Sequence, residues 1–507
     1  MFVITHETRE ALPKEGGTSF TLLKPPRFCR DLSDRRRGGS SPKLVRARFA
    51  PQPAHRRISL EMSREGRARR GSDRVTSGNL RQVSRAGHPV RRVAVLAYHS
   101  SPLTEPGSGD AGGMTVYVRG VAAAHAAAGI HTDIFTRATS EGGRIARISE
   151  SVRVVSIDAG PARVIPKQSM AQYIDEFVAG VQAFAAMQRT SYDIVHSHYW
   201  QSGLAAIPLA ERWGAPLVHS QHTLARVKNL YLAADDSAEP EARIGGEERV
   251  INRADVLIPS TDDEWEQLSC LYGALHDRMK IIHPGIDHAI FKPSAGVNER
   301  AEARGRLGLT PEHAVIMCVG RIQPLKGLSL ALKAAAELAS QLEREIAVVI
   351  VGGPSTPAGE AELGRLRRLA DNLSLGSRVR FLGPRPHGEL PELYRAADVL
   401  AVCSRTESFG LAALEAHACG VPVVATAVGG LKYVVHNGMS GWLLDSADPS
   451  KMAERLLPLL ADECLHRSYS EAAVASARRF SWDRTGAELL ELYSCLVAAS
   501  APEACTC

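Results

Sequence analysis

Two cations stand at a fixed spacing in the C-terminal half of the sequence and could neutralise a diphosphate. Arg321 and Lys326 lie in GRIQPLKG (residues 320–327), directly after the apolar segment 314–319 and before an expected helix. Two cations at the end of a buried strand, with a helix N-terminus nearby, can stabilise the negative charge of a diphosphate leaving group. The alternative is a solvated basic turn, which the position at the carboxyl end of a strand disfavours.

A second motif supplies two carboxylates. Glu407 and Glu415 lie in ESFGLAALE, after the apolar segment 399–402. We expect a helix to begin near Phe409, which puts Glu407 in the loop above its N-terminus and Glu415 about two turns into it. Each carboxylate can accept two hydroxyl hydrogen bonds of the kind that sugars offer. A lone glutamate is usually a cap or a surface residue, but the two motifs together favour a binding site.

A glycine-rich loop, GSGDAGG at residues 107–113, matches the GxGxxG pattern of dinucleotide-binding enzymes. Its first glycine comes nine residues after the expected strand ends at Tyr98, whereas the pattern requires it almost immediately. The second strand ends at Arg137 instead of an acidic residue that could bind ribose, and Asp133 lies in mid-strand. An enzyme using NAD is therefore disfavoured but stays open, and the loop is expected to face a phosphate.

The elements that must position these motifs alternate between short apolar strands and helices of about 10–17 residues, a pattern typical of parallel sheets covered on both faces. Two such series predict an α/β fold with two doubly wound domains, at residues 89–283 and 284–480, facing across a cleft. Ligands of such sheets bind at the carboxyl ends of the strands. A final helix near 481–496, within the segment 481–507, is expected to pack back on the first domain. Strands are expected at 92–98, 131–136, 193–197, 216–220, 255–259, 280–283, 314–319, 347–351, 379–382, 399–402 and 421–425.

Charge is divided unevenly along the 507 residues. Residues 1–92 hold 22 Lys and Arg against 8 Asp and Glu, which leaves 39 basic and 47 acidic residues in the rest. Residues 1–88 therefore read as a disordered basic tail, and a nucleic-acid-binding core has no electrostatic support. A binding protein acting through this tail stays an alternative. The sequence shows no apolar span, no signal-peptide pattern and nine scattered cysteines, so we expect a protein of the reducing cytoplasm.

The donor-side pattern, Gly-Arg-x4-Lys-Gly followed by Glu-x7-Glu, resembles that of the retaining glycosyltransferases of family 4, which have the GT-B fold. The resemblance spans roughly residues 91–496. YHSSP (98–102), GDAGGM (109–114), HSHYW (196–200) and HTL (222–224) narrow it to the D-inositol-3-phosphate glycosyltransferases. Those enzymes transfer N-acetylglucosamine from UDP-GlcNAc to 1D-myo-inositol 3-phosphate, the first step of mycothiol biosynthesis. Sucrose-phosphate synthases are more distant relatives, so another sugar phosphate or polyol stays an alternative acceptor.

The resemblance assigns roles to individual residues. Those implied to act at the reacting centre are His222, Arg321, Lys326 and Glu407. Those implied to bind the UDP-sugar donor are Gly113, Arg321, Lys326, Arg385, Glu407 and Glu415. Those implied to bind the inositol phosphate acceptor are His99, Asp110, Ala111, Gly112, Gly113, Met114, Thr115, Lys167, Tyr199, Thr223 and Arg243.

One residue departs from the family pattern. The family's loop usually continues Gly-Gly-Met-Asn, but here Thr115 follows Met114. If the asparagine contacts the acceptor, acceptor affinity or identity would change. No DxD motif is present at the donor loop, so we expect no metal in the chemistry, while a structural Mg²⁺ stays open. The partners implied are the two substrates and, by resemblance, a second copy of the chain in a homodimer.

Overall fold

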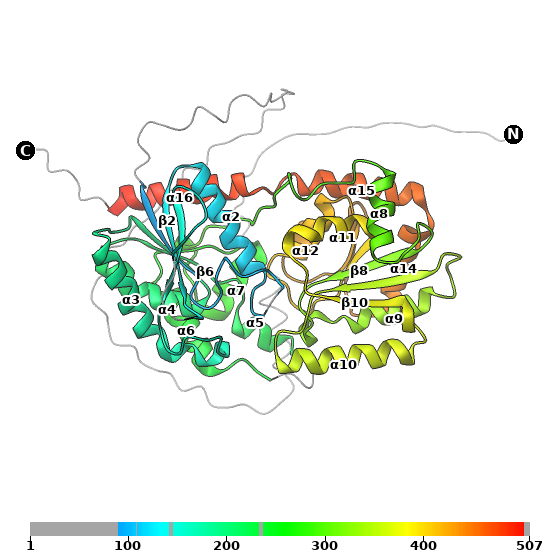
Figure 1. The fold of residues 1–507 in the computed structure, drawn as a ribbon, viewed down its shortest axis with the longest axis horizontal. Helices are drawn as coiled ribbons and strands as arrows, with labels where there is room; N and C mark the ends of the chain where they lie inside the picture. Colours follow the sequence, from blue (N-terminus) through cyan, green and yellow to red (C-terminus); the bar gives the residue numbers. More distant parts are fainter. Residues whose placement is uncertain (1–89, 108, 141–144, 233–236, 501–507) are drawn as a thin grey trace, which may run out of the picture. The chain divides into compact units, whose positions relative to one another are not determined.

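The computed structural model describes residues 90–107, 109–140, 145–232 and 237–500. The basic tail predicted at residues 1–88 lies outside this part of the chain. The described residues build two sheets of mainly parallel strands, each with helices packed on its faces (Figure 1). This is the predicted α/β architecture.

The first sheet has the strand order β3-β4-β2-β1-β5-β6-β7. All its neighbouring strands pair in parallel except β3, which runs antiparallel to β4 at one edge. Its strands are β1 (Arg92–Leu96), β2 (His131–Arg137), β3 (Ile145–Arg147), β4 (Val152–Ile157), β5 (Ile194–His198), β6 (Leu217–Ser220) and β7 (Val256–Leu257). Its helices are α2 (Gly113–Ala127), α3 (Ile174–Met187), α4 (Trp200–Trp213), α5 (Ala225–Leu230), α6 (Glu241–Arg253) and α7 (Asp262–Tyr272).

The strand expected at residues 280–283 does not form, and this prediction was wrong. The segment donates two backbone hydrogen bonds to the end of β7, from Lys280 to Leu257 (3.0 Å) and from Ile282 to Pro259 (3.2 Å). Because Pro259 has no N–H, it cannot return a bond, and the ladder stops. The apolar character of the segment instead serves the core, where Ile282 is fully buried.

The second sheet has the order β10-β9-β8-β11-β12-β13 and is parallel throughout. Its strands are β8 (Ala314–Val319), β9 (Ile346–Val351), β10 (Val379–Gly383), β11 (Val399–Val402), β12 (Val423–Thr426) and β13 (Gly441–Leu444). Its helices are α8 (Val297–Arg306), α9 (Ser329–Leu338), α10 (Pro357–Asn372), α11 (Leu390–Ala396), α12 (Leu411–Ala418), α13 (Leu431–Val434), α14 (Pro449–Ala461) and α15 (Glu463–Ala477). Short 3₁₀ turns lie at Lys167–Ser169, Ala171–Tyr173, His276–Arg278, Pro324–Lys326, Gly376–Arg378 and His387–Glu389.

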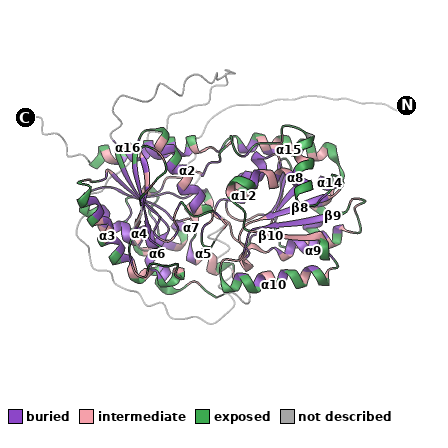
Figure 2. Cartoon of the chain, viewed as in Figure 1, coloured by how far each residue is buried: buried purple, intermediate pink, exposed green. Residues whose placement is uncertain are grey.

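The central strands of the second sheet are apolar along their whole length because helices cover both faces of that sheet. The six residues of β9, IAVVIV, are all buried, and those of β8 are buried up to the last residue. Continuous apolar strands of this kind are typical of sheets packed on two sides. Figure 2 shows buried residues along the strands and exposed residues on the outer surfaces of the helices. Each sheet thus has a hydrophobic core on each face.

The last helix, α16 (Trp482–Ser500), follows the second domain in sequence but packs on the first. It lies beside α2 (Figure 1), and its residues Leu489 and Tyr493 join the core on that face of the first sheet. The hydroxyl of Tyr493 lies 2.6 Å from Nδ1 of His196 on β5. The first domain is therefore completed by the C-terminal helix.

The two chain segments that connect the domains lie against each other. Thr485 donates a hydrogen bond to the carbonyl of His283 (2.8 Å). A side chain at Gly285 would come within 2.2 Å of the backbone at Ser481, so only glycine allows this approach. The ring of His283 lies 5.7 Å from that of Phe480. The two segments that connect the domains are thus packed against each other at one place.

We predict that Gly120→Ala destabilises the protein, because α2 and α16 meet there without space for a methyl group. A Cβ at Gly120 would lie 2.1 Å from the ring of Trp482. Overpacking of this kind typically costs about 1–3 kcal/mol. Gly245→Ala, in an open position of α6, is the matched control and should be neutral or raise stability by up to about 1 kcal/mol. Equal unfolding midpoints of the two variants in denaturant would contradict the close packing.

Candidate active site

A cavity of about 700 Å³ opens at the carboxyl ends of the strands and is lined by residues of both domains. Of the seventeen side chains and glycines assigned a role from the sequence, it brings together all but two. Those that line it are His99, Asp110, Gly112, Gly113, Met114, Lys167, Tyr199, His222, Thr223, Arg243, Arg321, Lys326, Arg385, Glu407 and Glu415. The cavity is therefore our candidate active site.

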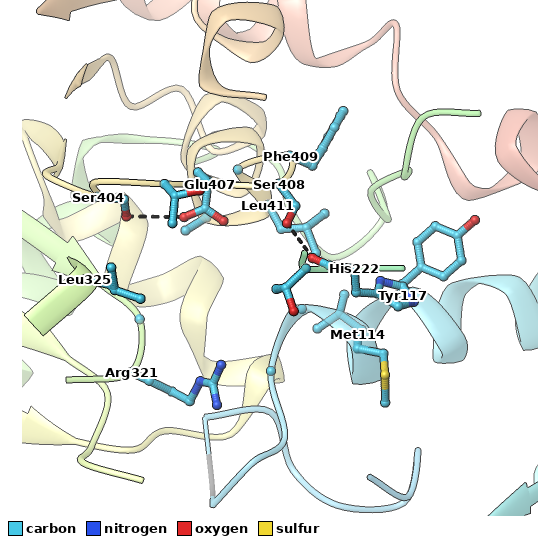
Figure 3. Close-up of a pocket in the computed structure, with 18 of the residues that line it drawn as sticks. Met114, Tyr117, His222, Arg321, Leu325, Ser404, Glu407, Ser408, Phe409 and Leu411 are labelled. Carbon is cyan, nitrogen blue, oxygen red and sulfur yellow. Dashed lines mark hydrogen bonds between the residues drawn. The ribbon is translucent and has the colours of Figure 1, made fainter. Parts of the chain in front are cut away.

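On the second-domain side, the two predicted cations project from the loop after β8. Nζ of Lys326 lies 2.6 Å from Oε2 of Glu407, and Ser404 donates a hydrogen bond to the same oxygen (3.2 Å). Arg321 extends toward the cavity on the side away from Glu407 (Figure 3), with Nη1 3.7 Å from a carboxylate oxygen of Asp110. Both cations are therefore placed to bind a diphosphate, and each lies beside a carboxylate.

Glu415 is held by two donors. Helix α12 begins at Leu411 instead of near Phe409, because Gly410 adopts a left-handed conformation (φ 98°). Glu415 is therefore only one turn into the helix, where its two oxygens lie 2.8 Å from Nε2 of His387 and 2.8 Å from the hydroxyl of Tyr394. The carboxylate is buried but keeps further lone pairs for a ligand hydroxyl.

The pKa of His387 is raised above its ordinary value. Burial by itself lowers this pKa, but the hydrogen bond and the negative charge of Glu415 outweigh the burial. Burial, together with the same carboxylate, raises the pKa of Tyr394 well above its ordinary range. Glu415 is thus an acceptor of fixed orientation, placed by two residues of the second domain.

His222 stands where the two domains meet. It follows β6 with a left-handed backbone (φ 63°), and its carbonyl accepts a hydrogen bond from the hydroxyl of Ser408, next to Glu407 (Figure 3). Nε2 of the ring lies 3.0 Å from Nδ1 of His198. Burial, and secondarily the charge of His219, lowers the pKa of His222 to about 3, so the imidazole is neutral at neutral pH.

On the first-domain side, two cations flank one aromatic ring. Nζ of Lys167 lies 4.4 Å and the guanidinium carbon of Arg243 lies 5.1 Å from the ring centroid of Tyr199. Arg243 is 5% exposed and donates to Glu247 (2.8 Å) and to the hydroxyl of Thr223 (3.0 Å). Two cations and a hydroxyl gathered in this way suit a phosphate group.

The pKa of Lys167 is lowered to about 8. Burial is the main cause; Asp110 raises the pKa, and the positive charges of Arg243 and Arg321 lower it further. The effect of the two arginines shows that positive charge is concentrated in this part of the cavity. Binding of an anion would relieve the repulsion.

Two residues predicted to touch the acceptor do not line the cavity. Ala111 is 2% exposed, and Thr115 is fully buried, with its hydroxyl 3.0 Å from that of Ser100. Thr115 lies in the first turn of α2 and is directed at the loop that follows β1. The side chain of Thr115 is therefore turned away from the cavity, and its contact with the acceptor stays a prediction.

Several residues of the site were not found from the sequence. They are His198, Glu239, Glu247, Ser260, Glu264, His387, Tyr394, Ser404 and Ser408. Glu264 carries a recognisable signal, since Thr261 and Glu264 form a T-x-x-E helix start in which the Thr261 hydroxyl accepts from the N–H of Glu264 (3.2 Å). Glu239, Glu247, Ser404 and Ser408 lie within four residues of Arg243 or Glu407 but form no recognisable motif with them. The remaining residues contact the site from distant segments, which spacing does not reveal.

Three further features hold for the described part of the chain. No group of three His, Cys, Asp or Glu side chains there is placed to hold a metal ion. None of the helices described is both long and apolar enough to cross a membrane. No disulfide joins any two of the six cysteines among these residues.

The fold and the cavity define a two-domain glycosyltransferase, and comparison with known proteins agrees. Residues 112–285 match the glycosyl transferase 4-like domain, and residues 299–476 match the glycosyl transferases group 1. The sucrose-phosphate synthase of Thermosynechococcus elongatus superposes with a TM-score of 0.74 at 30% identity, covering 81% of this chain and 100% of its own. WaaG, a glycosyltransferase of lipopolysaccharide biosynthesis, has a TM-score of 0.60 at 21% identity, covers 79% of this chain and 99% of its own, and shares the fold.

Two relatives narrow the family. The D-inositol 3-phosphate glycosyltransferase of Salinispora arenicola is 46% identical over 429 residues, which cover 82% of this chain and 96% of that protein. The enzyme of the same name from Mycobacterium tuberculosis is 45% identical over 418 residues, covering 82% and 85%. The chain belongs to the family of D-inositol 3-phosphate glycosyltransferases, within glycosyltransferase family 4.

We predict that Lys326→Ala lowers kcat by roughly 10²–10³, because one of two donors to the developing negative charge is removed. Its stability should change little, since the side chain is 29% exposed and its partner Glu407 also keeps the bond from Ser404. Lys333→Ala, at an exposed position of α9, is the matched control. Near-normal kcat in a folded Lys326→Ala protein would remove Lys326 from the reacting centre.

A second prediction concerns pH. The raised folded-state pKa of His387 means that its pairing with Glu415 stabilises the folded protein fully below the unfolded pKa of about 6.5. This contribution is lost as the pH rises through the folded pKa. The free energy of unfolding of wild type should therefore exceed that of His387→Asn by more at about pH 5.5 than at about pH 8.5. A difference independent of pH, measured in denaturant, would show that the pair is not ionic.

Proposed function

We propose that the chain transfers N-acetylglucosamine from UDP-GlcNAc to 1D-myo-inositol 3-phosphate, the reaction that opens mycothiol biosynthesis. The observation that carries this proposal is that one cavity holds two anion-binding groups. Arg321 and Lys326 lie on its second-domain side, and Lys167 and Arg243 lie on its first-domain side. A nucleotide-sugar diphosphate needs the first group, and a phosphorylated acceptor needs the second. The names of the two relatives include a phosphorylated acceptor, inositol 3-phosphate.

The proposed transfer retains the configuration of the sugar. The bond between the anomeric carbon and the diphosphate breaks, and its electron pair leaves with the diphosphate oxygen. The acceptor hydroxyl attacks the same face of the sugar, and its proton passes to the departing oxygen. Arg321 and Lys326 would stabilise the charge that develops on the diphosphate.

The remaining assignments are those that the resemblance to the family implies. Glu407, beside Lys326, would accept hydroxyl hydrogen bonds of the donor sugar, and Glu415 would accept those of the ribose. Arg385 would contribute its backbone to the base. The acceptor phosphate would lie against Lys167 and Arg243, with the phosphate oxygens replacing water around two cations that the protein already holds in place.

A second candidate acceptor is fructose 6-phosphate. The structural likeness to a sucrose-phosphate synthase, at 30% identity over all of that chain, supports it. Both acceptors carry a phosphate, so the clamp of Lys167 and Arg243 does not distinguish them. The two acceptors would instead be distinguished by their rings, inositol or fructose, which would contact His99 and the Asp110–Met114 loop.

The test is UDP release by the full-length protein with UDP-GlcNAc and one of three acceptors: 1D-inositol 3-phosphate, inositol 1-phosphate or fructose 6-phosphate. We expect release that requires 1D-inositol 3-phosphate and continues in EDTA, because no metal is assigned a step. We expect Lys167→Ala to raise the KM for this acceptor by about tenfold or more, as loss of a charged contact does, with little change in the KM for donor. Release that requires fructose 6-phosphate would establish the second candidate. Donor binding with no active acceptor would leave the donor site standing and refute the acceptor.

A further inference from the structure

Two histidines from neighbouring strands share one hydrogen bond at the wall of the cavity. His198 ends β5, and His222 follows β6 by two residues. Nδ1 of His198 lies 3.0 Å from Nε2 of His222. Burial lowers the pKa of both rings far enough that both are neutral near pH 7, so one proton occupies this bond. If His198 supplies this proton, His222 carries its own proton on Nδ1; if His222 supplies it, Nδ1 of His222 is bare. The donor in this bond therefore decides whether His222 can donate or accept a hydrogen bond at Nδ1.

The surroundings of His198 decide which of the two histidines donates in this hydrogen bond. Its second nitrogen, Nε2, is buried and has no hydrogen-bond partner among the described residues. The nearest ring, that of His196, already uses both nitrogens, with Tyr493 (2.6 Å) and with Ser220 (3.0 Å). If His222 were the donor, His198 would carry its proton on Nε2, as a buried N–H with no acceptor. Orphaned buried N–H groups are rare because they carry the full cost of lost hydration.

The other arrangement avoids this cost. If His198 donates from Nδ1, its Nε2 is a bare lone pair packed against rings. His222 then accepts at Nε2, and a neutral imidazole that accepts at one nitrogen carries its proton at the other. His222 would present Nδ1–H as a fixed donor.

The main chain of His222 is also fixed. Its left-handed backbone conformation is uncommon for a residue other than glycine. Its carbonyl receives the hydroxyl of Ser408 from the other domain. With the backbone held by Ser408 and the ring held by His198, His222 has a single orientation at the cavity wall.

We propose that His198 is a positioning residue that donates its Nδ1–H to His222 and so holds His222 in the Nδ1–H form, with a hydrogen-bond donor available to a sugar oxygen. The link to turnover rests on the proposed function. The protonation pattern of His222 does not, and it can be measured in the resting protein.

The first measurement is the ¹⁵N spectrum of the full chain labelled at histidine. Protonated and bare ring nitrogens resonate apart, and their couplings to the ring carbons' protons tell Nδ1 from Nε2. The signals of His222 are those that disappear in His222→Asn. We expect the proton on Nδ1 of His222. A proton on Nε2 of His222 overturns the inference whether or not any acceptor is active.

The second measurement compares two substitutions of equal shape. Asparagine at 198 places an N–H near the position of the lost Nδ1, whereas leucine offers none, and both remove the ring. We expect His198→Leu to mix the two protonation forms of His222 and to lower kcat by about 10- to 100-fold, since small misplacements beside reacting atoms cost on that order. His198→Asn should stay within about threefold of wild type, because the hydrogen bond is restored.

The matched control is His125→Asn. His125 on α2 is also fully buried, with one nitrogen bonded to Thr132 (3.0 Å) and the other without a partner. This variant should lower the unfolding midpoint but leave the His222 spectrum and kcat unchanged. Equal kcat for His198→Leu and His198→Asn would reduce His198 to a packing residue. If His198→Leu does not fold, the wild-type spectrum and His198→Asn still decide the matter.

Discussion

The balance of charge within one partly enclosed cavity is the constraint on which the site depends. Four cations face the same space, and like charges at such proximity disfavour each other's ionised forms. The protein meets this cost with carboxylates. Lys326 is paired with Glu407, Arg321 lies near Asp110, and Arg243 contacts Glu247. The positive potential is therefore available to an anion without making the empty cavity prohibitively repulsive.

Two arginines of the cavity differ in how firmly they are held. Arg243 is nearly inaccessible and is fixed by two carboxylates and the hydroxyl of Thr223. Arg321 keeps 30% of its side chain exposed, and its ion pair with Asp110 is longer, at 3.7 Å. The guanidinium of Arg243 is thus preorganised, while that of Arg321 can adjust as an anion arrives. Asp110 also raises the pKa of Lys167, so the loop that carries it affects both groups.

The sequence predicted best those elements whose residues are constrained locally. Strands β8 and β11 match the expected residues because each is a short, continuous apolar run between turns. Strand β13, GWLL, was missed because it begins with a glycine, which leaves too short an apolar run to tell from a loop. Residues 280–283 were misassigned because apolar residues can enter a core without joining a ladder, and Pro259 decides which happens here.

The residues of the site were also predicted best where the signal is local in the sequence. Arg321, Lys326, Glu407 and Glu415 were found because their spacing within a loop or a turn is itself the signal. His198 was passed over because its contact with His222 depends on the pairing of β5 with β6. These two strands are separated by the 18 residues 199–216. Thr115 was assigned to the acceptor because sequence fixes its place in the chain but not the direction of its side chain.

The packing of both interdomain crossings at Gly285 and Ser481 has a mechanical consequence. Since α16 returns to the first domain, the second domain is an insertion, tethered twice at a single point. A body tethered in this way can swing or twist about that point, but it cannot slide away or dissociate. Cutting one tether would leave the other in place, so the halves of the cavity would stay in register even in a nicked chain.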